Sequence, residues 1–67
     1  MDGNRLKGKL REAGFTQRSL ANSLGIGRNT LNLKINGKVP FNTKEVEEIC
    51  EKLGIRDSRE RVAIFLE

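Results

Sequence analysis

Residues Thr16–Lys38 read TQRSLANSLGIGRNTLNLKINGK, and this stretch predicts two short helices joined by a tight turn. Gly25 falls where the first helix must end in a left-handed residue, a conformation that glycine adopts without a Cβ penalty. Ala21 lies four residues earlier, and we expect its single methyl group to let the two helices approach closely. Apolar residues at helical spacing can then close a small core between the helices. These residues are Ile26, Leu31 and Ile35.

Glycine marks the ends of other helices in the same way. In REAGF (residues 11–15) and EKLGI (residues 51–55), a glycine follows the expected helix and an apolar residue follows the glycine. This is the spacing of a Schellman cap, in which the apolar residue packs back on the last turn. Asn36-Gly37 is expected to end a further helix through the same left-handed conformation.

Helix starts are marked by residues that favour the N-cap position. Thr16 is expected to cap one helix, and Asn42 with Glu45 and Asp57 with Glu60 have the spacing of capping boxes. No alternation of apolar and polar residues typical of a strand appears. The sequence therefore predicts an all-α fold, a compact bundle of about five short helices. Their approximate ranges are 4–13, 16–24, 27–36, 42–53 and 58–66.

Length and composition restrict the chain to one small domain, residues 1–67. Cys50 is the only cysteine and histidine is absent, so we expect neither a disulfide framework nor a metal site. Cys50 itself is interpreted as a small buried hydrophobe. No apolar run reaches the roughly 18 residues of a membrane helix. We therefore expect a cytoplasmic protein without a membrane partner.

The charge of the chain is distributed unevenly. Residues 1–44 carry nine Lys and Arg against two acidic residues, a net charge of +7. Residues 45–67 carry four Lys and Arg against seven acidic residues, a net charge of −3. A basic half is often only a solvated surface, but here it coincides with the two-helix pattern. This coincidence favours a surface that faces phosphates.

The two-helix stretch resembles a known family of DNA-binding motifs. The resemblance rests on the spacing Gln17–Leu20–Ala21–Gly25–Leu31–Asn36-Gly37-Lys38. It is similar to the helix-turn-helix of the lambdoid phage repressor and Cro proteins and of the wider xenobiotic-response-element-type regulators. The segment KINGKVPFNTKEVEEI is similar to small regulators of Gram-positive phages and prophages. The resemblance covers roughly residues 4–55 and implies a lambda-repressor-like domain that acts in a bacterial cell, associated with the nucleoid when bound.

The resemblance implies that the second helix of the pair, residues 27–36, enters the major groove of double-stranded DNA. Arg28 and Asn29 match positions that reach base edges, and Asn32 and Leu33 follow one turn later. The chemistry agrees, because Arg pairs bidentately with guanine and Asn with adenine. Leu33 has two equally weighted interpretations, contact with a thymine methyl group or packing under a loop.

Further residues match positions that contact the phosphate backbone in this family. They are Gln17, Arg18, Thr30, Lys34, Asn36 and Lys38. Lys34 stands where a large apolar residue is common, so we expect its stem to cover the core while its ammonium reaches a phosphate. A helix rotated relative to the family is the alternative. Gly27 replaces the usual Ser or Thr cap and should start this helix less strongly.

The C-terminal segment is unusually apolar for the end of a small domain. Val62, Ile64, Phe65 and Leu66 exceed what one helix face needs, and we interpret them as a dimer contact, with core coverage as the alternative. A homodimer could read a pseudo-palindromic operator in two half-sites about 34 Å apart.

The sequence favours a transcription regulator, a repressor or Cro-like protein, whose partner is a double-stranded DNA operator. The alternative is a protein–protein interaction module, such as an antirepressor or antitoxin, built on the same scaffold. An enzyme is not expected, because no set of catalytic residues and no phosphate-cradling loop is visible. Neither a cofactor nor a small-molecule ligand is expected.

Overall fold

Five short helices and tight connections make up the chain, for which we obtained a computed structural model that describes residues 1–66. The helices are α1 (Gly3–Glu12), α2 (Gln17–Leu24), α3 (Arg28–Ile35), α4 (Thr43–Leu53) and α5 (Ser58–Phe65). The described residues contain no strand, which confirms the predicted all-α fold of five helices. Each helix begins and ends within one residue of the range expected from the sequence.

Hydrogen bonds at the helix ends explain this agreement. Gly25 adopts a φ of 71°, and its N–H donates to the Asn22 carbonyl at 3.2 Å while the Ile26 N–H donates to the Ala21 carbonyl at 3.1 Å. This pair of bonds defines a Schellman cap. Equivalent bonds recur after α1, α3 and α4. The predicted glycine caps are therefore confirmed.

The helix starts agree with the sequence in two cases and differ in two. Thr16 caps α2, and Asn42 forms the expected capping box with Glu45 at the start of α4. The box expected from Asp57 and Glu60 was wrong. Asp57 accepts from the Arg59 N–H at 2.8 Å, whereas Glu60 forms an ion pair with Lys9 of α1. The start of α1 also differs, because Asp2 caps this helix and α1 begins at Gly3, one residue earlier than expected.

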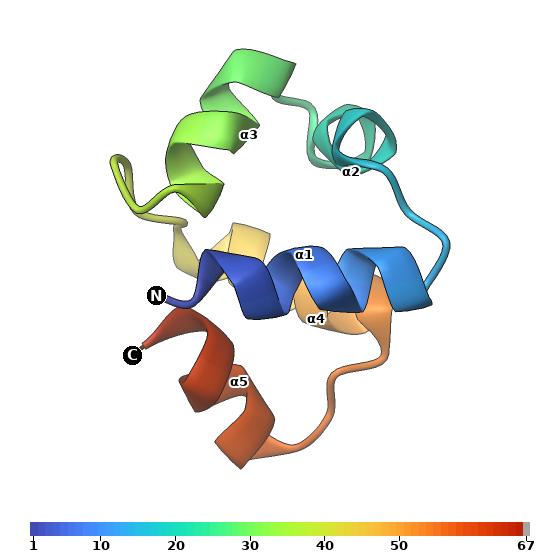
Figure 1. Cartoon of the computed structure of the whole chain (residues 1–67), viewed down its shortest axis with the longest axis vertical. Helices are drawn as coiled ribbons and strands as arrows, with labels where there is room; N and C mark the ends of the chain where they lie inside the picture. Colours follow the sequence, from blue (N-terminus) through green and yellow to red (C-terminus); the bar gives the residue numbers. More distant parts are fainter. Residues whose placement is uncertain (67) are drawn as a thin grey trace.

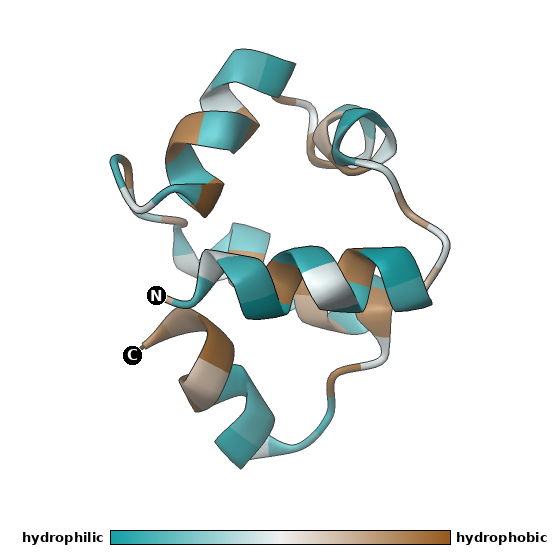
Figure 2. Cartoon of the chain, in the orientation of Figure 1, coloured by the Kyte–Doolittle hydropathy of each residue, from teal (hydrophilic) through white to brown (hydrophobic). Residues whose placement is uncertain are grey.

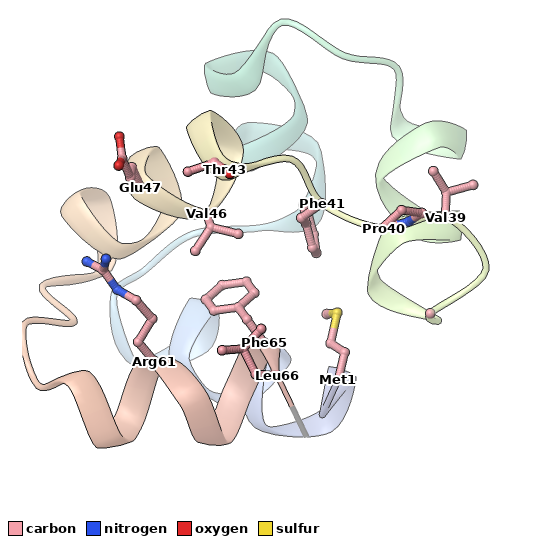
Figure 3. A pocket seen from close by; sticks show the side chains of 11 residues that line it. Met1, Val39, Pro40, Phe41, Thr43, Val46, Glu47, Arg61, Phe65 and Leu66 are labelled. Carbon is pink, nitrogen blue, oxygen red and sulfur yellow. The ribbon is translucent and has the colours of Figure 1, made fainter.

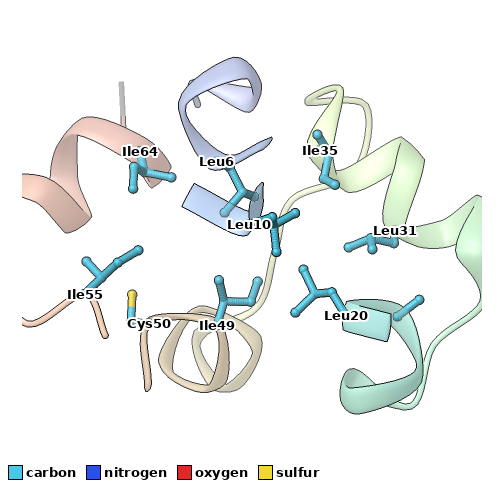
Figure 4. Packing of buried hydrophobic residues seen from close by; sticks show 10 residues of the cluster. Leu6, Leu10, Leu20, Leu31, Ile35, Ile49, Cys50, Ile55 and Ile64 are labelled. Carbon is cyan, nitrogen blue, oxygen red and sulfur yellow. The ribbon is translucent and has the colours of Figure 1, made fainter. Parts of the chain in front are cut away.

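One apolar core connects all five helices (Figure 4). Its buried members are Leu6, Leu10, Leu20, Ala21, Leu31, Ile35, Ile49, Cys50, Ile55 and Ile64. Ala21 on α2 is buried as predicted, and α2 packs directly against α3. Cys50 is a buried thiol on the inward side of α4, which confirms its interpretation as a core residue.

The helices are arranged around α1, which crosses the middle of the molecule (Figure 1). The α2–α3 pair lies on one side of α1 and α5 lies on the other. The residue before α1 contacts α5, since the Asp2 N–H donates to the Ile64 carbonyl at 2.8 Å. No helix in the described part of the chain is long and apolar enough to cross a membrane. This arrangement leaves one side of α3 uncovered.

Candidate nucleic-acid interface

Helix α3 has a buried side and an exposed side. Leu31, Lys34 and Ile35 are buried. Asn32 and Leu33 lie between them in the sequence but point toward the exposed side, because successive residues are 100° apart around the helix axis. The exposed side carries the four residues expected to contact bases: Arg28, Asn29, Asn32 and Leu33. Figure 2 shows the first turn of α3 as hydrophilic and directed away from the rest of the molecule. The structure thus brings these four side chains onto one accessible surface.

The start of α3 is chemically open. Gly27 precedes it and contributes no side-chain hydrogen bond, as expected from the sequence. Within residues 1–66, the backbone N–H groups of Arg28, Asn29 and Thr30 donate to no acceptor. Unpaired N–H groups at a helix start carry partial positive charge and favour an anion such as a phosphate. The Arg28 side chain leaves from the same turn and adds a full positive charge.

The start of α2 differs, because its capping box already occupies one of the backbone N–H groups of the first turn that could bind an anion. Thr16 Oγ1 accepts from the Ser19 N–H at 3.0 Å, and Ser19 Oγ accepts from the Thr16 N–H at 2.9 Å. Gln17 is half-buried and Arg18 is exposed. Among residues 1–66, nothing accepts from the backbone N–H groups of these two residues. The start of α2 therefore also presents donors suited to a phosphate.

Positive charge dominates the surface around these helices. Residues 16–38 contain no Asp or Glu, and the exposed cations of this stretch are Arg18, Arg28 and Lys38. Thr30 and Asn36, the remaining residues expected at phosphates, are exposed as well. Most acidic residues belong to α4 and α5 instead. The α2–α3 stretch therefore presents exposed cations and contains no acid of its own.

Lys34 departs from its expected position, and the prediction of a phosphate contact needs correction. Only 9% of its surface is exposed, and its Nζ donates to Glu45 Oε1 at 2.5 Å and to Oε2 at 2.6 Å. Its ammonium also lies 5.9 Å from the centre of the Phe41 ring. The cause is helical geometry, since Lys34 follows Leu31 by three residues and therefore lies on the same, buried side of the helix. A lysine held there needs an acidic partner rather than a phosphate.

The ion pair perturbs the titration of Glu45. Burial raises the pKa of the Glu45 carboxyl, but hydrogen bonds from Lys34 and from the Asn42 N–H, together with the charge of Lys34, outweigh it. The net result is a pKa below the ordinary value of 4.5. Sequence reasoning missed this pair. The available signal was a lysine on an apolar helix face followed, eleven residues later, by the acid of a capping box.

Leu33 is 46% exposed, so the structure does not place it under a loop. Its backbone carbonyl accepts from the Lys38 N–H at 2.9 Å and from the Val39 N–H at 3.3 Å. These bonds bring the loop after α3 close to the backbone of Leu33 while its side chain remains accessible. Contact with a thymine methyl group stays a prediction.

The residues expected at a dimer contact separate into two groups. Ile64 is fully buried in the core, so its assignment to a dimer surface was wrong and core coverage explains it. Phe65 packs edge-to-face against Phe41, with ring centres 5.8 Å apart. Val62 and Leu66 are 41% and 76% exposed and remain available to a partner.

Leu66 borders an apolar groove of about 560 Å³ between the loop after α3, the start of α4 and the end of α5 (Figure 3). Phe41, Val46, Phe65 and Leu66 provide its apolar lining. Figure 3 shows Glu47 and Arg61 near one end of the groove. The groove lies on a different part of the surface from the first turn of α3 (Figures 1 and 3).

Comparison with known proteins gives one match. A family model described as "Protein of unknown function (DUF739)" matches residues 1–66, a range that contains all five helices. No curated protein and no solved structure matches the chain.

Proposed function

This chain belongs to the DUF739 family, and we propose that it is a sequence-specific DNA-binding protein that regulates transcription. The proposal places it among phage- and prophage-type regulators, as a repressor or Cro-like protein. One observation supports it above the others. The exposed side of α3 combines Arg28 and Asn29 with three open backbone N–H groups and no neighbouring acid in residues 16–38.

In the proposed complex, α3 lies in the major groove and α2 lies across the phosphate backbone. Arg28 donates two hydrogen bonds to a guanine, and Asn29 pairs with an adenine. Asn32 and Leu33 read the bases one turn further along the groove. Contacts to phosphates fix the register of the helix and carry no sequence information. The residues proposed for them are Gln17, Arg18, Thr30, Asn36 and Lys38.

We further propose that the protein acts on DNA as a homodimer. Exposed Val39 and Leu66 line the groove together with Phe65, and exposed Val62 lies one helical turn before Leu66. These residues support the dimer, because a contiguous apolar surface favours a protein contact. A two-fold dimer would present two copies of α3 to half-sites about one helical turn apart.

Selection of bound sequences from a random duplex pool, followed by footprinting, tests the proposal. We expect one enriched site, and a symmetric footprint if the protein binds as a dimer. Arg28→Ala should weaken binding to that site by about 1–3 kcal/mol and relax its sequence preference. Lys38→Ala should weaken binding to all sequences alike and lower the salt slope by about 1. Lys52→Ala changes an exposed lysine of α4 and serves as the control with little effect.

The same experiment separates this proposal from an interaction module on a helix-turn-helix scaffold. A DNA-binding protein should lose affinity steeply as salt rises, because counterions are released from the phosphates. Absence of any enriched site, together with unchanged duplex affinity in Arg28→Ala and Lys38→Ala, would refute the proposed function.

A further inference from the structure

The ion pair between Lys34 and Glu45 joins the last turn of α3 to the first turn of α4. Both carboxylate oxygens accept from Lys34 Nζ, and the two residues are 9% and 8% exposed. The pair therefore has directional hydrogen bonds and little access to water. It is the kind of contact that specifies one geometry and tolerates few others.

Glu45 performs two structural tasks with one carboxylate. Its Oε1 also accepts from the Asn42 N–H at 3.0 Å, while Asn42 Oδ1 accepts from the Glu45 N–H at 2.8 Å. The capping box thus fixes the position of the carboxylate at the start of α4, independently of Lys34. An acceptor held in this way provides a fixed reference point for α3.

The other contacts of α3 with the core are mainly apolar. Leu31 and Ile35 are buried among the side chains of the other helices, and apolar burial is not directional. Such contacts hold the helix against the core, but they contain no hydrogen bond whose direction would specify its orientation. Lys34 lies on the same side and adds the directional bond that the apolar residues lack.

Rotation of α3 determines which side chains face outward. Arg28 and Asn29 lie about 120° and 140° around the helix axis from Lys34, and both are exposed. A rotation of α3 about its axis would therefore move both groups sideways relative to a base edge. Hydrogen bonds to bases require donor–acceptor distances of about 2.7–3.2 Å. A displacement of about 1 Å is therefore enough to weaken them.

We propose that the Lys34–Glu45 ion pair is a positioning device that fixes the rotation of α3, so that Arg28 and Asn29 meet base edges. This inference rests on the proposed function. Lys34 and Glu45 are positioning residues that contact no DNA. Their contribution is to sequence preference more than to stability, because a buried ion pair often contributes little net stabilisation compared with well-packed residues of similar size.

The test compares two double variants that remove the same charges. Lys34→Met with Glu45→Gln removes the buried pair but retains side-chain volume and an amide acceptor for the capping box. Lys9→Met with Glu60→Gln removes the ion pair between α1 and α5, which lies away from α3 (Figure 1). Net charge is unchanged in both variants. Thermal unfolding identifies a temperature at which each is folded.

Affinity is then measured for the selected site and for unrelated duplex DNA over a range of salt concentrations. We expect the Lys34/Glu45 variant to lose at least about fivefold in affinity for the selected site, as for one weakened base contact. Its affinity for unrelated DNA and its salt slope should remain those of wild type. The Lys9/Glu60 variant should retain both affinities. An unchanged preference in the first variant overturns the proposal, and so does a parallel loss on both DNAs with a smaller salt slope.

A readout without DNA separates this inference from the proposed function. Residual dipolar couplings of the backbone amides report the orientation of α3 relative to α1 and α4. We expect them to change for α3 in the Lys34/Glu45 variant and to stay unchanged in the control. If wild type enriches no DNA site, the proposed function fails and the couplings alone decide the positioning role. Unchanged couplings in α3 would overturn it.

Discussion

Replacement of Gly3 by alanine probes the contact between the start of α1 and the end of α3. A Cβ atom at this position would overlap the backbone carbonyl oxygen of Ile35, and it would lie 3.4 Å from the Ile35 carbonyl carbon and from its Cγ2. Since the obstacle is backbone rather than a flexible side chain, α1 or α3 must shift to relieve the overlap. Gly8, in the same helix, provides a matched control because a Cβ there meets nothing within 4 Å.

The two substitutions should have opposite effects on stability. Alanine exceeds glycine in helix propensity by up to about 1 kcal/mol, so Gly8→Ala should stabilise the protein by about 0.5–1 kcal/mol. Gly3→Ala gains less from propensity at the first turn, and the forced shift costs about 1–3 kcal/mol. We therefore expect a net loss of about 1–2 kcal/mol. For a domain of this size, each kcal/mol moves Tm by about 4–8 °C.

Thermal unfolding followed by far-UV circular dichroism measures both effects, since the chain has no Trp or Tyr for fluorescence. Tm should fall for Gly3→Ala and rise for Gly8→Ala. The reasoning would be refuted if Gly3→Ala raised Tm as much as Gly8→Ala does. Such a result would mean that α1 does not approach the end of α3 as closely as the structure indicates.

Three further predictions test other parts of the fold. The lowered pKa of Glu45 adds stability that is complete above its ordinary pKa of 4.5 and is lost as pH falls through the lower folded value. Urea unfolding across this pH range should therefore show a smaller pH dependence for Glu45→Gln than for wild type. Equal pH dependence of the two proteins would contradict the assignment. Gly25→Ala places a Cβ in open space at a φ of 71°, so it should cost about 1–2 kcal/mol from the backbone alone, and an unchanged urea midpoint would argue against the left-handed cap. Ile49→Ala empties a fully buried site and should cost about 2–5 kcal/mol of unfolding free energy, out of the roughly 3–10 kcal/mol expected for this chain length. The control Leu66→Ala changes an exposed site and should alter stability by less than about 0.5 kcal/mol. Similar losses in both variants would place Ile49 outside the core.

Agreement between sequence and structure is best where the cause is local. A left-handed glycine followed by an apolar residue ends a helix through bonds within six residues, so the ends of α1, α2 and α4 could be predicted. The capping box failed at Asp57 because its prediction considered only nearby residues. Glu60 pairs instead with Lys9, about fifty positions earlier in the chain. No local pattern contains that competing partner.

The candidate interface shows the same difference between features with a local cause and features that depend on residues distant in the sequence. Arg28, Asn29, Asn32 and Leu33 were assigned to the outward face through the resemblance to the helix-turn-helix family, and all four are exposed in the structure. The pairing of Lys34 with Glu45 could not be assigned, because it depends on how the loop after α3 returns α4 to the side of that helix. The division of the C-terminal residues, with Ile64 inside and Leu66 outside, likewise depends on where α5 packs.

The amino-acid sequence by itself determined the number of helices, their ends and the outward side of the two-helix stretch, because each follows from backbone conformation and periodicity over a few residues. Tertiary structure alone decided which charges neutralise one another and which apolar residues remain available to a partner. The physical reason is that the energy of an ion pair or of a buried methyl group depends on distance in space, and separation along the chain does not reveal that distance.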